Sequence, residues 1–206
     1  MAPPAAMNAL ESQLVAIARV MTALNNQFAL VGGLAVGVRC EPRFTKDIDL
    51  AVSVATDRDA ETTIWGLRDH GYGISMVLEH ETTGRLSTVR LHAPGTERED
   101  AVVDVLFSSS GIEPELVSAA ELLEVAHAVT MPVARIGHLI ALKTLARDDR
   151  RRPQDAGDLR ALIRAAPPGD VALAREAIEL ITARGYHRGR DLGALLAQAI
   201  ADAAEA

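Results

Sequence analysis

The sequence has little of what marks several large classes of protein. Cys40 is its single cysteine, so the chain cannot form an internal disulfide, which fits a reducing compartment. Aromatic residues make up only 3% of the 206 residues while hydrophobic residues make up 49%, so a core must consist mainly of aliphatic side chains. That length suffices for one full domain, alone or with a small appendage.

Long apolar runs and a secretory leader are also missing. No uninterrupted apolar stretch approaches the roughly 20 residues of a membrane span, and the opening MAPPAAMNALESQ lacks the basic and apolar regions of a secretory signal. We therefore expect a soluble cytoplasmic protein with no membrane partner. Acidic residues exceed basic ones by 28 to 21, a net charge of −7, which argues against non-specific coating of nucleic acid but leaves room for a local basic groove.

The first half of the chain mixes helical and strand patterns. Apolar residues at helical spacing predict a helix over residues 8–25, and a second helix is expected over residues 59–70, capped by Thr56 or Asp57. A short helix is expected at LAVGVRC, and strands at FALVG, DIDLAV, YGISMVLEH, LSTVRLHA and AVVDVLF. The turn ETTGR makes one pair an antiparallel hairpin, so the sheet should be mixed.

The second half is predicted to be mainly helical. Residues 112–135 are ambiguous between helix and short strands, and four helical patterns follow from Ile136 onward, separated by breaks such as Pro167-Pro168-Gly169. We expect an α/β (α+β) fold, in which a mixed sheet flanked by helices over residues 1–115 is followed by a mostly helical region, a C-terminal bundle, over residues 116–206.

Three aspartates interrupt apolar strand patterns. Asp47 and Asp49 stand two apart on a strand, so their side chains share a face, where a divalent cation such as Mg²⁺ would relieve their repulsion. Asp104 interrupts AVVDVLF, and three converging carboxylates can hold two metal ions. The pair could instead be a solvated strand end, and Asp104 could cap a turn or pair with a buried arginine. Together with the glycine pair upstream, they favour a metal site.

Glycines and basic residues surround the first aspartate pair. Gly32 and Gly33 follow a strand and precede a helix, a place where backbone N–H groups can bind phosphate or where glycine simply allows packing. Arg39 and Arg43 flank the following loop and could contact phosphates or an RNA backbone. The most basic run is RDDRRR, either a solvated loop or a surface for RNA or triphosphate. Its arginines are Arg147, Arg150, Arg151 and Arg152.

Two acidic residues and a lysine stand out in the helical half. Lys143 lies among leucines in HLIALKTLA and could merely extend its ammonium from a helix face to solvent. Asp155 and Asp158 are three apart and share a helix face, where either could form a surface pair with Arg151 or Arg152.

These segments together resemble a known superfamily. VGGLAVGVRCEPRFTKDIDL resembles the core motif of the polymerase-β-like nucleotidyltransferases, and RFTKDID is similar more narrowly to the AbiEii/MenT group of bacterial toxins. LIALKTLARDDRR resembles the third motif of that group, with Lys143 as its lysine, and QDAGDLRAL the fourth, with Asp158 as its aspartate. The resemblance covers roughly residues 28–163.

The resemblance implies roles for individual residues. Asp47 and Asp49 would bind Mg²⁺, and Asp104 would be the third carboxylate, able to act as base toward the acceptor hydroxyl. Asp158 would orient Lys143 or the nucleotide, with the helical half completing the active site, whereas the role of Asp155 stays open. The residues implied to contact the nucleotide triphosphate are Gly32, Gly33, Arg39, Arg43, Thr45, Lys46 and Lys143.

The resemblance also implies a function. It indicates a Mg²⁺-dependent nucleotidyltransferase, the toxin of a toxin–antitoxin system, which transfers a nucleoside monophosphate from an NTP to an RNA such as the tRNA 3′ end and so blocks translation. A cognate antitoxin protein would be its partner. Two alternatives stay open: a small-molecule nucleotidyltransferase of the antibiotic-modifying type, and a non-catalytic nucleotide-binding protein.

Overall fold

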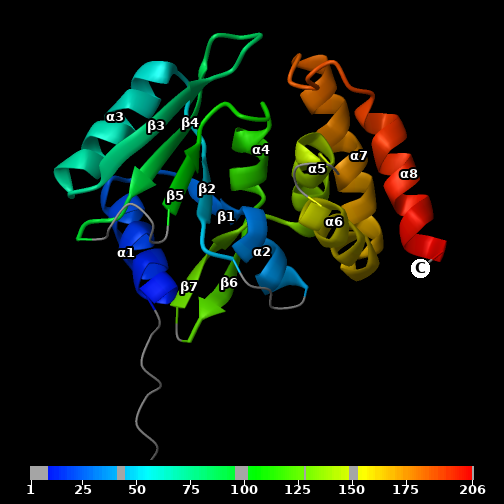
Figure 1. Cartoon of the computed structure of the whole chain (residues 1–206), viewed down its shortest axis with the longest axis horizontal. Helices are drawn as coiled ribbons and strands as arrows, with labels where there is room; N and C mark the ends of the chain where they lie inside the picture. The colour runs from blue at the N-terminus through cyan, green and yellow to red at the C-terminus, as the bar shows by residue number, and fades with distance from the viewer. Residues whose placement is uncertain (1–8, 41–44, 96–101, 128, 149–152, 206) are drawn as a thin grey trace, which may run out of the picture.

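A mixed β-sheet forms the centre of the protein. The computed structural model describes residues 9–40, 45–95, 102–127, 129–148 and 153–205. Within these residues seven strands form one sheet in the order β3-β4-β5-β2-β1-β7-β6 (Figure 1). The strands are β1 (Phe28–Val31), β2 (Ile48–Val52), β3 (Gly73–Glu79), β4 (Leu86–His92), β5 (Val102–Leu106), β6 (Glu121–Ala126) and β7 (Val129–Val133). The expected α/β fold with a mixed sheet is confirmed.

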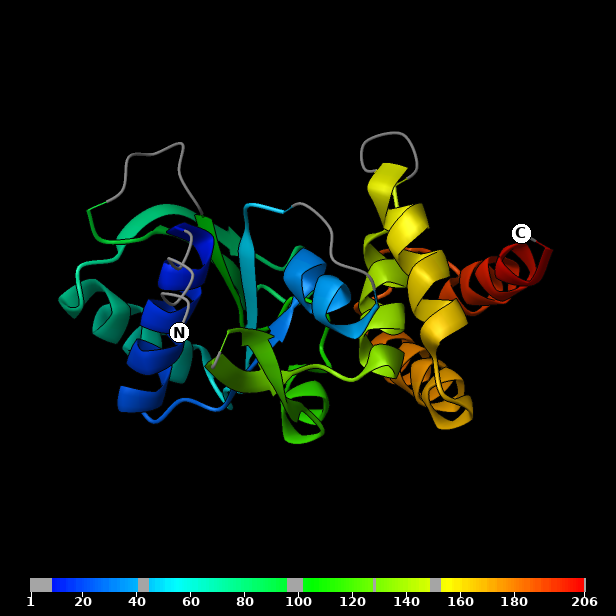
Figure 2. The ribbon, with the colours of Figure 1, turned by 90° about the horizontal axis from the view of Figure 1, so that it is seen from below.

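Helices cover both faces of this sheet. Figures 1 and 2 show α1 and α3 on one face, α2 and α4 on the other, and α5 to α8 gathered as a bundle beside α2. The helices are α1 (Ala9–Ala23), α2 (Gly32–Arg39), α3 (Asp57–Asp69), α4 (Glu113–Ser118), α5 (Ile136–Ala146), α6 (Pro153–Ala165), α7 (Pro168–Ala183) and α8 (Leu192–Glu205). Because α2 packs against β1 and β2 as well as against α5 and α6, it joins the sheet to the bundle.

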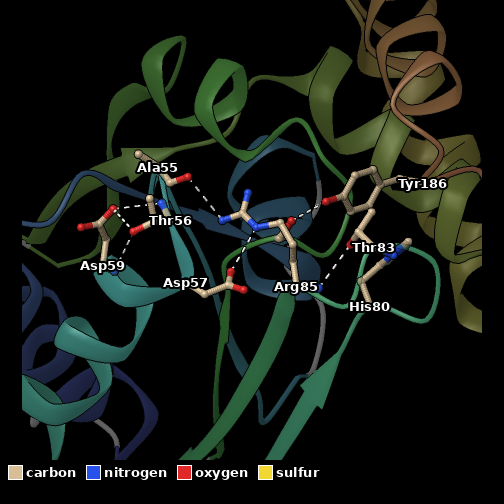
Figure 3. A network of polar contacts seen from close by, with 9 residues as sticks. Ala55, Thr56, Asp57, Asp59, His80, Thr83, Arg85 and Tyr186 are labelled. Atoms are coloured by element: carbon tan, nitrogen blue, oxygen red, sulfur yellow. Dashed lines mark hydrogen bonds and ion pairs between the residues drawn. The ribbon is translucent and has the colours of Figure 1, made fainter.

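Most elements lie where the sequence patterns place them, and local chemistry explains their ends. Thr56 caps α3 through a reciprocal capping box, in which its hydroxyl accepts from the Asp59 N–H and the Asp59 carboxylate accepts from the Thr56 N–H (Figure 3). The ambiguous residues 112–135 become α4 and the hairpin of β6 and β7, which completes the sheet beyond residue 115. The purely helical part therefore begins at Ile136.

Alternating burial along β4 and β5 explains how an aspartate can stand inside an apolar strand. Val103 and Val105 are fully buried in the core, while Asp104 between them points to the opposite face and is only half-buried. The sequence AVVDVLF looks like a fully buried strand because the alternate residues Val102 and Leu106 are also apolar. Among the residues described by the structure, no helix is long and apolar enough to cross a membrane.

Candidate active site

The sheet brings the aspartates of β2 and β5 side by side. The two strands are parallel neighbours, and Asp49 stands directly opposite Asp104 in their register. Asp47 immediately precedes β2 and is exposed, whereas Asp49 is half-buried. All three carboxylates line one cleft of about 710 Å³ between the sheet and the helical bundle. The convergence that the sequence patterns predicted for these three residues is therefore present in the fold.

Gly32 meets Asp49 where β1 turns into α2. Val31, the last residue of β1, pairs with Asp49, and Gly32 follows with φ +65, a conformation that side chains rarely adopt. A β-carbon at position 32 would overlap the Asp49 carboxylate, so only glycine fits beside it. Gly33 also lines the cleft, and Val31, the N-cap residue of α2, makes no side-chain cap hydrogen bond. The N-terminus of this helix, an end that favours anionic ligands, therefore lies at the cleft beside Asp49.

Lys143 on α5 binds both aspartates of α6. Its Nζ lies 2.7 Å from Asp155 Oδ1 and 2.7 Å from Asp158 Oδ2. All three side chains are largely buried, with 12%, 5% and 6% of their surfaces exposed. Asp155, whose role the sequence left open, therefore contacts the lysine as closely as Asp158 does, and it lines the cleft together with Lys143. The lysine and the two aspartates thus form a buried triad, while Arg151 and Arg152, the partners considered from the sequence, lie outside the described residues.

Arg90 on β4 is a site residue that the sequence analysis missed. It stands opposite Asp104 in the antiparallel β4–β5 pair and donates two hydrogen bonds to it, Nε to Oδ1 at 2.8 Å and Nη2 to Oδ2 at 2.7 Å. This bidentate contact raises the pKa of the Arg90 guanidinium, and the charges of Asp47 and Asp49 add to the shift. Asp104 thus stands opposite Asp49 and also pairs with an arginine, although Arg90 is 38% exposed rather than buried. Within the described residues no three acidic side chains are arranged to hold a metal ion, so metal binding by Asp104 stays a prediction. The sequence does contain a signal for Arg90: the residue stands between apolar residues in the alternating strand LSTVRLHA, a pattern that places its side chain on the face opposite to theirs.

The other basic candidates differ in where they lie relative to the cleft. Arg39, at the far end of α2 from the glycines, donates to the carbonyls of Ala134 and Val133 and pairs with Glu121, and it is not among the residues that line the cleft. It fastens α2 to the β6–β7 hairpin. Thr45 lines the cleft, Lys46 beside it is exposed, and Arg147 follows the end of α5 outside the cleft lining. Four candidates lie outside the described residues: Arg43, Arg150, Arg151 and Arg152.

The hairpin turn contacts the segment between α7 and α8 close to the cleft residues Ser109 and Arg188. The turn between β3 and β4 carries His80, whose ring packs on Tyr186 from the segment between α7 and α8, with ring centroids 4.2 Å apart. The Tyr186 hydroxyl hydrogen-bonds the Ser108 hydroxyl just beyond β5. Arg188, two residues after Tyr186, lines the cleft and donates to the Ser109 carbonyl. The sheet and the bundle therefore meet at α2 on one side of the cleft and at Tyr186 on the other.

Comparisons with known proteins agree with this geometry. The chain matches the family described as nucleotidyl transferase AbiEii toxin, type IV toxin–antitoxin system, over residues 15–205. An antigenic nucleotidyltransferase-like protein from Paracoccidioides brasiliensis shares its fold, with a TM-score of 0.55, 18% identity, and 91% of this chain and 92% of that chain covered.

Other solved structures are less similar. The lincosamide antibiotic adenylyltransferase LnuA gives a TM-score of 0.48 at 16% identity, with 77% of this chain and 99% of that chain covered. JHP933 from Helicobacter pylori gives 0.45 at 15% identity, with 95% and 89% covered. A search of curated protein sequences finds no significant match. Because the family match spans most of its length, this chain belongs to the AbiEii family of nucleotidyltransferase toxins of type IV toxin–antitoxin systems.

Proposed function

We propose that this nucleotidyltransferase moves a nucleoside monophosphate from an NTP to a hydroxyl at the 3′ end of an RNA, such as a tRNA, in a Mg²⁺-dependent reaction that blocks translation. The observation that carries the proposal is that Asp49 and Asp104, opposite each other on adjacent strands, line one cleft together with Gly32 at the start of α2. Membership of a toxin family supports an acceptor that cells need for growth, such as a tRNA. Lys143 and Arg90 line the same cleft as the carboxylates, which supports substrates that carry phosphates.

Asp47 and Asp49 have the chemistry to hold the metal ion. Both residues line the cleft, and the absence of a side chain at Gly32 gives the Asp49 carboxylate its place there. Within the described residues no group of three or more acidic, histidine or cysteine side chains is arranged to hold an ion by itself. That fits Mg²⁺, which commonly takes one or two carboxylates and completes its shell with waters and substrate phosphates. When bound there, Mg²⁺ would neutralise charge on the triphosphate oxygens.

The side chains then have distinct tasks in the transfer. The N-terminus of α2 binds the triphosphate through its N–H groups, and the Lys143 ammonium contacts a phosphate while Asp155 and Asp158 hold it in place. The acceptor hydroxyl oxygen bonds to the α-phosphorus as the bond from that phosphorus to the bridging oxygen breaks, and pyrophosphate leaves with the electron pair. Asp104 accepts the hydroxyl proton.

The proposal includes a partner and a place of action. Membership of a type IV toxin–antitoxin family implies a cognate antitoxin, which we expect to be a separate protein. NTPs and tRNA are both cytoplasmic, so the proposed reaction takes place in the cytoplasm.

Labelling of RNA tests the proposal directly. Purified protein is incubated with Mg²⁺, total tRNA and each of the four NTPs in turn, labelled at the α-phosphate. One or more NTPs should label RNA, and Asp49→Ala should reduce that labelling at least about 100-fold because the metal loses a ligand. Glu61→Gln, an exposed change on α3 away from the cleft, serves as the control. Undiminished labelling by Asp49→Ala contradicts the metal site, and no RNA label with any NTP contradicts the RNA acceptor.

A further inference from the structure

The cleft continues past Asp104 onto an apolar surface that the transfer described so far does not use. We call it the hairpin strip: Met76 and Leu78 on β3, Thr88 on β4 and Leu106 on β5, all of which line the cleft. Met76 and Leu78 are 40% and 48% exposed, although both are large and apolar. β3 is an edge strand without a buried residue, so folding alone does not explain these two side chains.

The sheet register places the strip on a line with the reacting groups. Asp49 stands opposite Asp104, Asp104 opposite Arg90, and Arg90 opposite Met76, one residue on each successive strand. With neighbouring strands about 4.8 Å apart, Met76 lies about 10 Å from Asp104 along the sheet. Gly32 lies at the other end of this line, beside Asp49. A single nucleoside whose ribose hydroxyl reaches Asp104 is long enough to cover the strip with its base.

The in-line geometry of the transfer determines which substrate occupies which end of the cleft. The attacking oxygen and the leaving pyrophosphate stand on opposite sides of the α-phosphorus. If the N-terminus of α2 and Lys143 hold the pyrophosphate side, the acceptor enters from the side of Asp104 and extends over β4 and β3. We propose that the hairpin strip is the acceptor subsite and that it binds the terminal nucleoside of an RNA, with the base lying on Met76 and Leu78; this inference rests on the proposed function.

The charges at this end of the cleft fit a nucleic acid. Among the described residues lining the cleft beyond Asp104, the charged ones are Arg90 and Arg188, and both are cations. Arg188 also lies close to the hairpin turn, where burial first and then the charge of Arg188 lower the pKa of His80. Guanidinium groups beside an apolar surface suit a phosphate next to a flat base.

The hairpin is fastened where it carries the strip. At its turn Arg85 donates to the Asp57 carboxylate at 3.0 Å and to the Ala55 carbonyl, which ties the turn to the start of α3 (Figure 3). On the other side His80 packs against Tyr186, as Figure 3 also shows. An edge strand held at its turn from both sides presents a preformed surface, so binding there does not first have to order the strand.

The test compares two faces of one strand. Met76→Ala/Leu78→Ala removes the apolar contacts of the strip, while Val77→Ala is the matched control, because Val77 is 51% exposed on the same strand but does not line the cleft. Binding of a 5′-fluorescein RNA oligonucleotide ending in CCA is measured by anisotropy, and the apparent KM for total tRNA and the KM for NTP by labelling. The double variant should weaken oligonucleotide binding and raise the tRNA KM about fivefold or more, with the NTP KM within about twofold of wild type. Val77→Ala should leave all three unchanged.

The other possible outcomes distinguish failure of the subsite proposal from failure of the proposed transfer to RNA. If the double variant labels tRNA with an unchanged tRNA KM, or if Val77→Ala is equally impaired, the strip is not the acceptor subsite while RNA labelling still stands. If the wild type binds the oligonucleotide through Met76 and Leu78 but labels no RNA, the strip is an RNA-binding surface, but it is not the acceptor subsite and RNA is not the acceptor of the transfer. If the wild type neither binds the oligonucleotide nor labels RNA, both proposals fall.

Discussion

At Gly32 the backbone approaches the Asp49 carboxylate too closely for a β-carbon to fit. Its left-handed φ of +65 turns the chain from β1 into α2, and the place of its missing β-carbon is taken by the Asp49 carboxylate. The glycine therefore has two separable functions, to adopt a backbone conformation and to leave space. Substitution of Gly32 can be compared with substitution of Gly84, which has the same φ but nothing within 4 Å of its β-carbon position. The comparison separates the need for space from the need for the backbone conformation.

Gly32→Ala should fold but lose activity. The left-handed conformation costs an alanine about 1–2 kcal/mol, and in addition the methyl group must displace the Asp49 carboxylate. We expect nucleotidyl transfer to fall about 100-fold, since small displacements of reacting groups have effects of that size. Gly84→Ala, with the same φ cost and no overlap, should lose only the stability that the φ cost accounts for and should keep its activity. Denaturant unfolding and RNA labelling measure both quantities, and equal activities for the two variants would contradict the role of the space beside Asp49.

At the scale of elements, Lys143 ties α5 to α6. The lysine and its two aspartates are buried together, so they differ from exposed ion pairs such as that of Arg184 with Glu115, whose side chains are 38% and 39% exposed. A buried carboxylate without its partner is costly, whereas an exposed pair contributes little. The triad therefore has a part in stability as well as in the proposed binding of phosphate.

Lys143→Met should lower the free energy of unfolding by about 3 kcal/mol, because it removes the cation that two buried carboxylates share. Adding Asp155→Asn and Asp158→Asn should recover most of that loss but none of the transfer activity, which separates the two roles of the lysine. Arg184→Met, as the exposed comparison, should cost less than about 1 kcal/mol. Urea denaturation provides the measurement. A Lys143→Met protein as stable as wild type would mean that the triad does not hold the helices together.

The elements also show which features sequence patterns can predict. The periodicity of α1, the capping of α3 by Thr56 and the β3–β4 hairpin are local, and each was predicted within a few residues. The pairing of Asp104 with Arg90 needs the register of two strands, and the contacts of Arg39 with Val133 and Ala134 join residues 94 and 95 positions apart. Such contacts arise only when the sheet assembles and cannot be read from neighbouring residues. The sequence suggested phosphate contact for Arg39 only because the residue is positively charged and flanks the loop before Asp47.

At the scale of the whole molecule, α5 lies at the centre of the helical half. It packs against α6, α7, α8 and α2, and most of its residues are buried, His138 among them at 3% exposure. Burial, with Arg135 nearby, lowers the pKa of His138 to about 4, while Asp170 and Glu115 oppose the shift. The imidazole is therefore neutral in the folded protein at pH 7, and protonating it would place a charge in the helical core.

The fold should consequently lose stability as the pH falls from about 6.5 to about 4. Over that range the unfolded chain, with a histidine pKa near 6.5, binds a proton that the folded protein, with a pKa of about 4, does not bind. The loss from this group is at most about 3 kcal/mol and is complete below the folded pKa. Urea denaturation at a series of pH values should show a shallower decline for His138→Gln than for wild type, whereas His127→Gln, at an exposed position, should follow wild type. Parallel curves for wild type and His138→Gln would show that acid sensitivity of the helical half arises elsewhere.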